Sequence, residues 1–165
     1  MIRLAGQLGA LLFLTAIQVS FINALPYPFD RIPLVLVVTT YLYQYRSYTT
    51  LWWWLPLYGS ILDVLGISTA PFEVISYTLA AGCLTILVAH VFTNRSFYGI
   101  VATSWLCLAV LTLSEIVLLG LSQLFSDGFL PWKNLVMTNL WSGAFAAILL
   151  LFVAPFFRRS IGRRS

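Results

Sequence analysis

Three carboxylates interrupt apolar stretches of the sequence, where a charged side chain is unfavourable. Asp63 lies inside the run YGSILDVLGISTAPFE, Glu73 ends that run, and Glu115 stands within LTLSEIVLLG. An ionised carboxylate that faces lipid costs several kcal/mol, so each acid should face a bundle interior, a wet cavity or a partner protein. With the nearest outer cation, Arg31, these acids form a predicted polar intramembrane or partner-docking patch.

Two interpretations of this patch follow from the residue types. In the first, Asp63 and Glu115 bond to nearby hydroxyls or to Arg31 and only fix helix packing. In the second, they line an outward-facing polar pocket or a docking surface. Because Gly59 and Gly66 share a helical face with Asp63, that face carries almost no bulk. We expect Asp63 to lie near Arg31 or Glu115.

The chemistry of an enzyme or a metal centre is not suggested by the remaining polar residues. The only histidine, His90, has no H-E-x-x-H partner, and Cys83 and Cys107 lack the spacing of a metal or redox motif. Phosphate-binding glycine patterns are missing as well. We therefore predict a protein that is not an enzyme, with no cofactor and no metal site.

The composition places these acids in a membrane protein. Hydrophobic residues make up 61% of the 165 residues and charged residues only 8%, whereas about a quarter of a soluble domain is charged. The apolar runs are continuous rather than alternating, which indicates helices. About 20 residues are needed per span, so the chain has room for about six.

The predicted fold is an all-α integral membrane protein, a single domain over residues 1–165. Prolines, turns and charged residues divide the chain into six transmembrane helices. Pro56 falls inside the third span, where we expect a kink. The predicted spans cover residues 4–24, 32–46, 50–67, 72–92, 97–124 and 133–157.

Six spans place both termini on one side of the membrane. Under that topology one side receives seven arginines and the other receives only Arg31 and Lys133. The positive-inside rule then makes the arginine-rich side cytoplasmic, with both termini there, and puts the three acids in the outer half of the bilayer. The net charge of +4 reflects this topology rather than a nucleic-acid partner, and none is predicted. The surroundings predicted for the chain are the lipid bilayer.

Small residues recur at helical spacing on several spans. The helix-packing glycines predicted from this spacing are Gly6, Gly9, Gly59, Gly66, Gly82 and Gly143. Such faces let helix backbones approach closely within lipid. They suit packing within the chain or docking of a partner helix, and the first span is the best candidate for docking.

The order of these features resembles the MreD family of bacterial rod-shape-determining proteins. A glutamine-bearing first span ends before prolines, and a second span opens at a proline. A segment of the type G-x-x-x-D and then a proline-aromatic pair follow, here Gly59, Asp63, Pro71 and Phe72. The family's usual glycine after that pair is Glu73 in this sequence.

The resemblance implies a membrane subunit of the bacterial cell-elongation machinery, the elongasome. It would reside in the bacterial cytoplasmic (inner) membrane and bind MreC as a scaffold for cell shape and cell wall organisation. It would help couple peptidoglycan synthesis, through RodA and a class B penicillin-binding transpeptidase, to the MreB cytoskeleton.

A second class of membrane protein has a similar six-helix design: the substrate-binding subunits of energy-coupling-factor vitamin transporters. In that alternative the small-residue ridges of the first span would meet the coupling subunit, and the outer acids would line a vitamin pocket. The sequence lacks a long polar outer loop suited to closing over a vitamin.

Overall fold

Every element in the described part of the chain is helical. The computed structural model describes residues 2–45, 49–66, 72–91, 97–123 and 132–161. The long helices alternate with short 3₁₀ turns, and α4 continues into a π turn. The elements are α1 (Ile2–Ser20), η1 (Ile22–Ala24), η2 (Phe29–Arg31), α2 (Leu34–Tyr45), η3 (Thr49–Trp53), α3 (Trp54–Val64), α4 (Glu73–Ile86), η4 (Leu87–Val91), α5 (Phe97–Gln123) and α6 (Trp132–Ile161).

Each predicted span corresponds to a helical segment, but the segments differ in length. Three stretches are long and apolar enough to cross a membrane: Leu4–Ala24, Glu73–Val91 and Tyr98–Leu118. The 12 residues of α2 and the 11 of α3 extend only roughly 18 and 17 Å, short of the roughly 30 Å of hydrocarbon. The three long stretches indicate a helical membrane protein.

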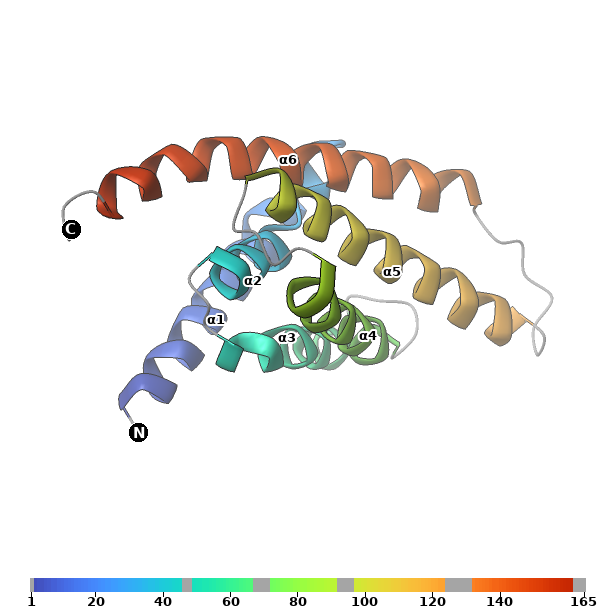
Figure 1. The fold of residues 1–165 in the computed structure, drawn as a ribbon. Coiled ribbons are helices and arrows are strands. Elements are labelled where there is room, and N and C mark those ends of the chain that lie inside the picture. Colours follow the sequence, from blue (N-terminus) through green and yellow to red (C-terminus); the bar gives the residue numbers. More distant parts are fainter. Residues whose placement is uncertain (1, 46–48, 67–71, 92–96, 124–131, 162–165) are drawn as a thin grey trace.

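The short helix α2 occupies the centre of the molecule. In Figure 1 it lies between α6 and α5 above and α3 and α4 below, with α1 at the left. Val35, Leu36 and Val37 are at most 3% exposed, and Thr39 and Thr40 are fully buried. Both threonine hydroxyls donate to backbone carbonyls one turn earlier, so no polar atom of these side chains is left without a partner.

Two apolar clusters hold the helices around α2. The larger joins α2, α3, α4, α5 and α6 through residues that include Leu55, Leu84, Cys107 and Leu150. The smaller joins α1, α2 and α3 around Leu11 and Trp54. Because both clusters include residues of α2, this helix links the two halves of the bundle.

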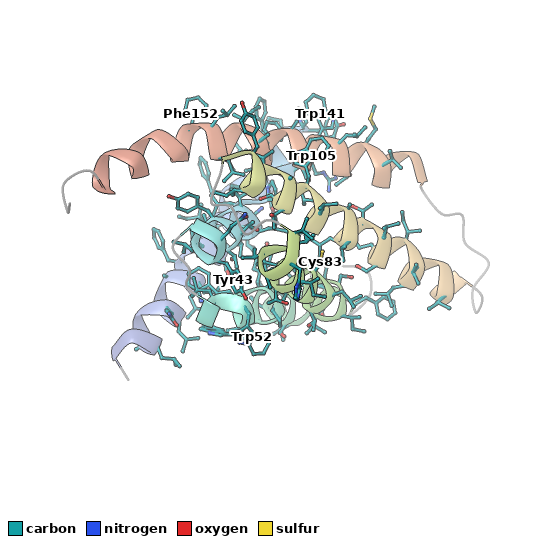
Figure 2. The ribbon with its side chains drawn as sticks, viewed as in Figure 1. Tyr43, Trp52, Cys83, Trp105, Trp141 and Phe152 are labelled. Atoms are coloured by element: carbon teal, nitrogen blue, oxygen red, sulfur yellow. The ribbon has the colours of Figure 1, made fainter. Side chains whose placement is uncertain are left out.

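The outer surface remains strongly apolar. Phe13 is 67% exposed and Phe152 is 68% exposed, together with many leucines and valines. Figure 2 shows Phe152 and Trp141 along the outer edge of α6. A soluble protein rarely presents apolar surface on this scale, and a lipid-facing surface does so by necessity.

The expected kink at Pro56 is corrected by the structure. A 3₁₀ turn over Thr49–Trp53 precedes α3, so Pro56 lies in the first turn of the α-helix. Backbone N–H groups in a first turn have no partner within the helix, and proline is tolerated there. The backbone therefore changes from a 3₁₀ helix to an α-helix between Trp53 and Trp54, just before Pro56.

Candidate functional site

Asp63 closes the junction between α3 and α4. Its Oδ1 accepts a hydrogen bond from the backbone N–H of Glu73 at 3.1 Å, and its Oδ2 accepts one from Val74 at 3.0 Å. These are the first two N–H groups of α4, which have no partner inside their own helix. The carboxylate thus caps α4 from a neighbouring helix, and its negative charge suits the positive end of the helix dipole.

Gly59, one turn before Asp63 on α3, permits this approach. A Cβ added at Gly59 would lie 2.7 Å from the Glu73 carbonyl oxygen and 2.9 Å from the Val74 Cα. Both are backbone atoms, which cannot move aside as a flexible side chain can. The G-x-x-x-D spacing therefore encodes one joint, in which the glycine admits the end of α4 and the aspartate caps it.

Gly66 ends α3 rather than packing against another helix. Its φ of +62° lies in the left-handed region, and a Cβ added there would meet no atom within 4 Å. Its N–H donates to the Asp63 carbonyl at 3.1 Å. Many helices end at a glycine in this conformation. Gly66 therefore terminates α3, and the helix-packing role predicted for it is wrong.

Gln18 forms a second clamp, between α1 and the start of α2. Its Nε2 donates to the Ile32 carbonyl at 2.8 Å, and its Oε1 accepts from the Leu34 N–H at 3.0 Å. Pro33, between them, has no N–H to donate. One buried amide thus satisfies the two backbone groups on either side of this proline.

A polar cavity of about 190 Å³ lies where these elements meet. The segment between α1 and α2 forms one wall, and side chains of α2, α3, α4, α5 and α6 form the others. Its polar lining consists of Gln18, Asn23, Asp30, Arg31, Tyr58, Tyr77, Thr112, Glu115, Thr138 and Ser142.

Aromatic contacts hold the outer wall of this cavity against α6. Tyr27 meets Trp141 edge-on with ring centroids 6.3 Å apart, and Phe29 meets Phe145 at 5.6 Å. Trp141 and Phe145 also stack on each other at 6.0 Å. These ring pairs fix the segment that carries Asp30 and Arg31 over the end of the bundle.

The charges in the cavity are unevenly paired. Arg31 Nε lies 3.0 Å from Asp30 Oδ2, and the arginine side chain is 43% exposed. Glu115 lines the same cavity and interacts electrostatically with both Arg31 and Glu73. Among the described residues, however, no hydrogen bond to the Glu115 carboxylate is found, and the buried Asp30 Oδ1 also has none. Glu115 is therefore the acid of the described lining that can still accept a hydrogen bond from a ligand in the cavity.

The predicted polar patch is gathered in space, but it divides into two parts. Asp63 and Glu73 belong to the α3/α4 junction, whereas Arg31 and Glu115 line the cavity. The hydrogen bonds of Asp63 run to the backbone of α4, not to the partners expected for it, because the first N–H groups of that helix are closer. The side chain of Lys133 lies outside the described residues, as do Pro71 and the loop arginines at positions 46 and 95.

The predicted packing glycines also fall into two classes. Gly59 packs on α4, and Gly143 on α6 lies where an added Cβ would be 3.0 Å from the Trp105 ring of α5, which Figure 2 labels beside α6. By contrast, a Cβ at Gly6, Gly9 or Gly82 would meet nothing within 4 Å. These three glycines are exposed, and they line no close helix contact with the described part of the chain.

Sequence reasoning missed several residues that build the site. Tyr58 and Tyr77 meet edge-on at 5.0 Å in the cavity wall, and apolar spacing gave no sign of this pairing. Asp30 was overlooked, although its place beside Arg31 was a usable signal. Cys83 and Cys107, treated as isolated thiols, interact with each other across α4 and α5.

Among the described residues, no group of three or more His, Cys, Asp or Glu side chains is placed to hold a metal ion. Comparison of the chain with protein-family models, with curated proteins and with solved structures yields no match. The function is accordingly argued from the geometry of the junction, the cavity and the exposed helix faces.

Proposed function

We propose that this chain is an MreD-like subunit of the bacterial cell-elongation machinery, a membrane scaffold that binds MreC. In this role it helps couple peptidoglycan synthesis by RodA and a class B penicillin-binding transpeptidase to the MreB cytoskeleton. It carries out no reaction itself, and its action depends on how its helices present themselves to partner helices.

The α3/α4 junction is the observation that carries this proposal. The resemblance rests on a short motif that includes Gly59 and Asp63. Here the two defining residues, Gly59 and Asp63, act on the same two residues of α4, Glu73 and Val74. Because Gly59 and Asp63 serve the same helix contact, their spacing in the motif has a structural explanation, and this supports the resemblance.

We assign partner binding to the face of α1 that carries Gly6 and Gly9. The residues Ala5, Gly6, Gly9 and Ala10 are all exposed, and in the described part of the chain a Cβ added at either glycine would meet no atom within 4 Å. Small residues at this spacing allow a second helix to approach closely, and association in lipid depends on such close packing. A single transmembrane helix of MreC fits this face.

The proposed topology keeps six membrane-embedded segments with both termini in the cytoplasm of a bacterial cell. The short helices α2 and α3 are shielded by their neighbours, so they need not match the full thickness of the hydrocarbon. The arginine asymmetry supports this orientation. It places the segment between α1 and α2, with Arg31, at the outer surface.

The test is a pull-down of the tagged full chain from its native membranes in a mild detergent, with mass spectrometry of co-purifying proteins. We expect MreC with RodA or its transpeptidase. Gly9→Leu should reduce recovery of MreC about tenfold, because bulk on the α1 face separates the helices. Gly82→Leu, a matched change on an exposed face of α4, should leave recovery unchanged.

A vitamin-binding subunit is the second candidate, and the polar cavity is the observation that favours it. Its volume of about 190 Å³ is, however, below the roughly 300 to 1,000 Å³ of sites that enclose a drug-sized ligand. Recovery of two ATPase subunits and a coupling membrane protein in the same pull-down, or of a stoichiometric vitamin, would replace the scaffold proposal with this one.

A further inference from the structure

We propose that the polar cavity binds a primary ammonium group, as presented by the ethanolamine headgroup of a phospholipid or by a small free amine. This inference goes beyond the proposed scaffold function and does not depend on any partner protein. It rests on the unused acceptors of the cavity, its aromatic wall, its size and its position in the bundle.

The charged side chains of the described lining have a net charge of −1 when Glu115 is ionised, which one positively charged ligand would neutralise. Asp30 and Arg31 form an ion pair with each other, which leaves Glu115 as the surplus charge of the described lining when it is ionised. Glu115 lines the cavity, and no hydrogen bond to its carboxylate is found among the described residues. An ammonium group has three donors and no acceptor, so it matches a site whose open positions are carboxylate oxygens.

The aromatic wall favours a positively charged ligand, whether primary or quaternary, and the carboxylate acceptor then selects the primary ammonium. Tyr58 and Tyr77, in an edge-on pair, both line the cavity. The face of a tyrosine ring attracts cations, and the attraction strengthens where water is excluded. Tyr58 is only 5% exposed, so its ring lies in such an environment.

Size and position narrow the class further. The volume of about 190 Å³ is below the roughly 300 to 1,000 Å³ of sites for drug-sized ligands. This suits a headgroup of a few heavy atoms. Asn23 and Arg31 are exposed where the chain crosses from α1 to α2, so the cavity extends to one end of the bundle. In a membrane, lipid headgroups lie at the ends of helical bundles.

The test uses the purified full chain in detergent, to which phosphatidylethanolamine, phosphatidylcholine and phosphatidylglycerol with identical acyl chains are added. Native mass spectrometry measures the lipid retained. We expect about a tenfold preference for the ethanolamine lipid over the choline lipid, since a quaternary ammonium cannot donate hydrogen bonds. One charge-assisted hydrogen bond contributes about 1.4 kcal/mol, which corresponds to a factor of ten.

Free ethanolamine, tested by its effect on thermal unfolding of the same sample, distinguishes the two sources. Stabilisation by the lipid alone identifies a headgroup site, and stabilisation by free ethanolamine alone identifies a soluble amine. Equal retention of all three lipids without any effect of ethanolamine overturns the proposal.

Variants assign the effect to the cavity. Glu115→Gln should abolish the preference for the ammonium ligand, and Asp63→Asn, which changes an acid outside the lining, should preserve it. If Glu115→Gln does not fold, Thr138→Leu fills the cavity without removing a charge and should also abolish the preference. Retention of the preference in a folded Glu115→Gln or Thr138→Leu protein contradicts the proposal. Lipid selectivity of the isolated chain and recovery of MreC are separate readouts, so either proposal can fail alone.

Discussion

The α3/α4 junction and the polar cavity each contain an acid from an apolar helix, and they use it in opposite ways. Both oxygens of Asp63 accept backbone hydrogen bonds from α4, and Gly59 beside it brings the helices into contact. Glu115 faces a space of about 190 Å³, with no hydrogen bond found among the described residues. A carboxylate inside a helical bundle is therefore architectural where backbone donors converge on it and available for a ligand where they do not.

The largest expected effect comes from closing the space that the junction needs. Gly59→Ala should lower the free energy of unfolding by about 3 kcal/mol, because its Cβ would overlap backbone atoms of α4. Thermal unfolding in detergent measures this loss. Gly82→Ala is the control: its Cβ meets nothing within 4 Å, so stability should stay equal or rise slightly. If both variants unfold at the wild-type temperature, the close contact is not a feature of the protein.

Removing the Gln18 clamp should have the next largest effect. Gln18→Leu removes the side-chain hydrogen bonds to the Ile32 carbonyl and the Leu34 N–H, which then keep only their 3.0 Å hydrogen bond to each other, and we expect the free energy of unfolding to fall by about 2 kcal/mol. Gln18→Glu keeps the acceptor for Leu34 but loses the donor to Ile32, so its melting temperature should fall between those of the leucine variant and the wild type. A leucine variant as stable as wild type argues against the clamp.

Asp63→Ala tests the capping role directly. We expect a loss of about 1.5 kcal/mol, in the range measured for helix caps, because two N–H groups of α4 lose their acceptor. Asp63→Asn retains one side-chain oxygen and should lose less. Hydrogen exchange of the Glu73 and Val74 amides localises the effect, and unchanged protection of both amides in the alanine variant would contradict the assignment.

Glu115→Gln should have the smallest effect on stability and thus sharpens the comparison with Asp63. Since no hydrogen bond to this carboxylate is found among the described residues, the ligand-free protein should stay within about 0.5 kcal/mol of wild type in the same unfolding measurement. A loss comparable to that of Asp63→Ala would show that Glu115 is also architectural.

Much of the helical pattern could be predicted from the sequence. The ends of α5 and α2 were predicted within about two residues, since continuous apolar runs bounded by proline or charge define helices in a membrane protein. The predicted range 32–46 already made the second span short, but the length of α3 relative to a membrane was not anticipated. Apolar composition looks the same for a helix surrounded by lipid and a helix surrounded by other helices, and α2 is of the second kind.

The aromatic residues illustrate the same limit. The tryptophans at positions 52 to 54 and the tyrosines at 41 and 43 lie close together in the sequence. In the structure Trp52 is 53% exposed and lies at the edge of the molecule in Figure 2, but Trp54 is only 2% exposed and Tyr41 only 4%. Helical rotation distributes neighbouring aromatic residues between surface and core, and the sequence does not state which direction is inward.

By itself, the sequence determined a helical membrane protein, the positions of its helices and the unusual acids within them, because apolar content and breaks in the apolar runs are local properties. Only the tertiary structure shows that both carboxylate oxygens of Asp63 accept hydrogen bonds from α4, whereas Glu115 lines the cavity. It also decided which glycines touch a neighbour: Gly59 and Gly143 do, whereas Gly6, Gly9 and Gly82 do not. Both outcomes depend on distances between helices far apart in the chain, which are set by the packing of the whole bundle around α2.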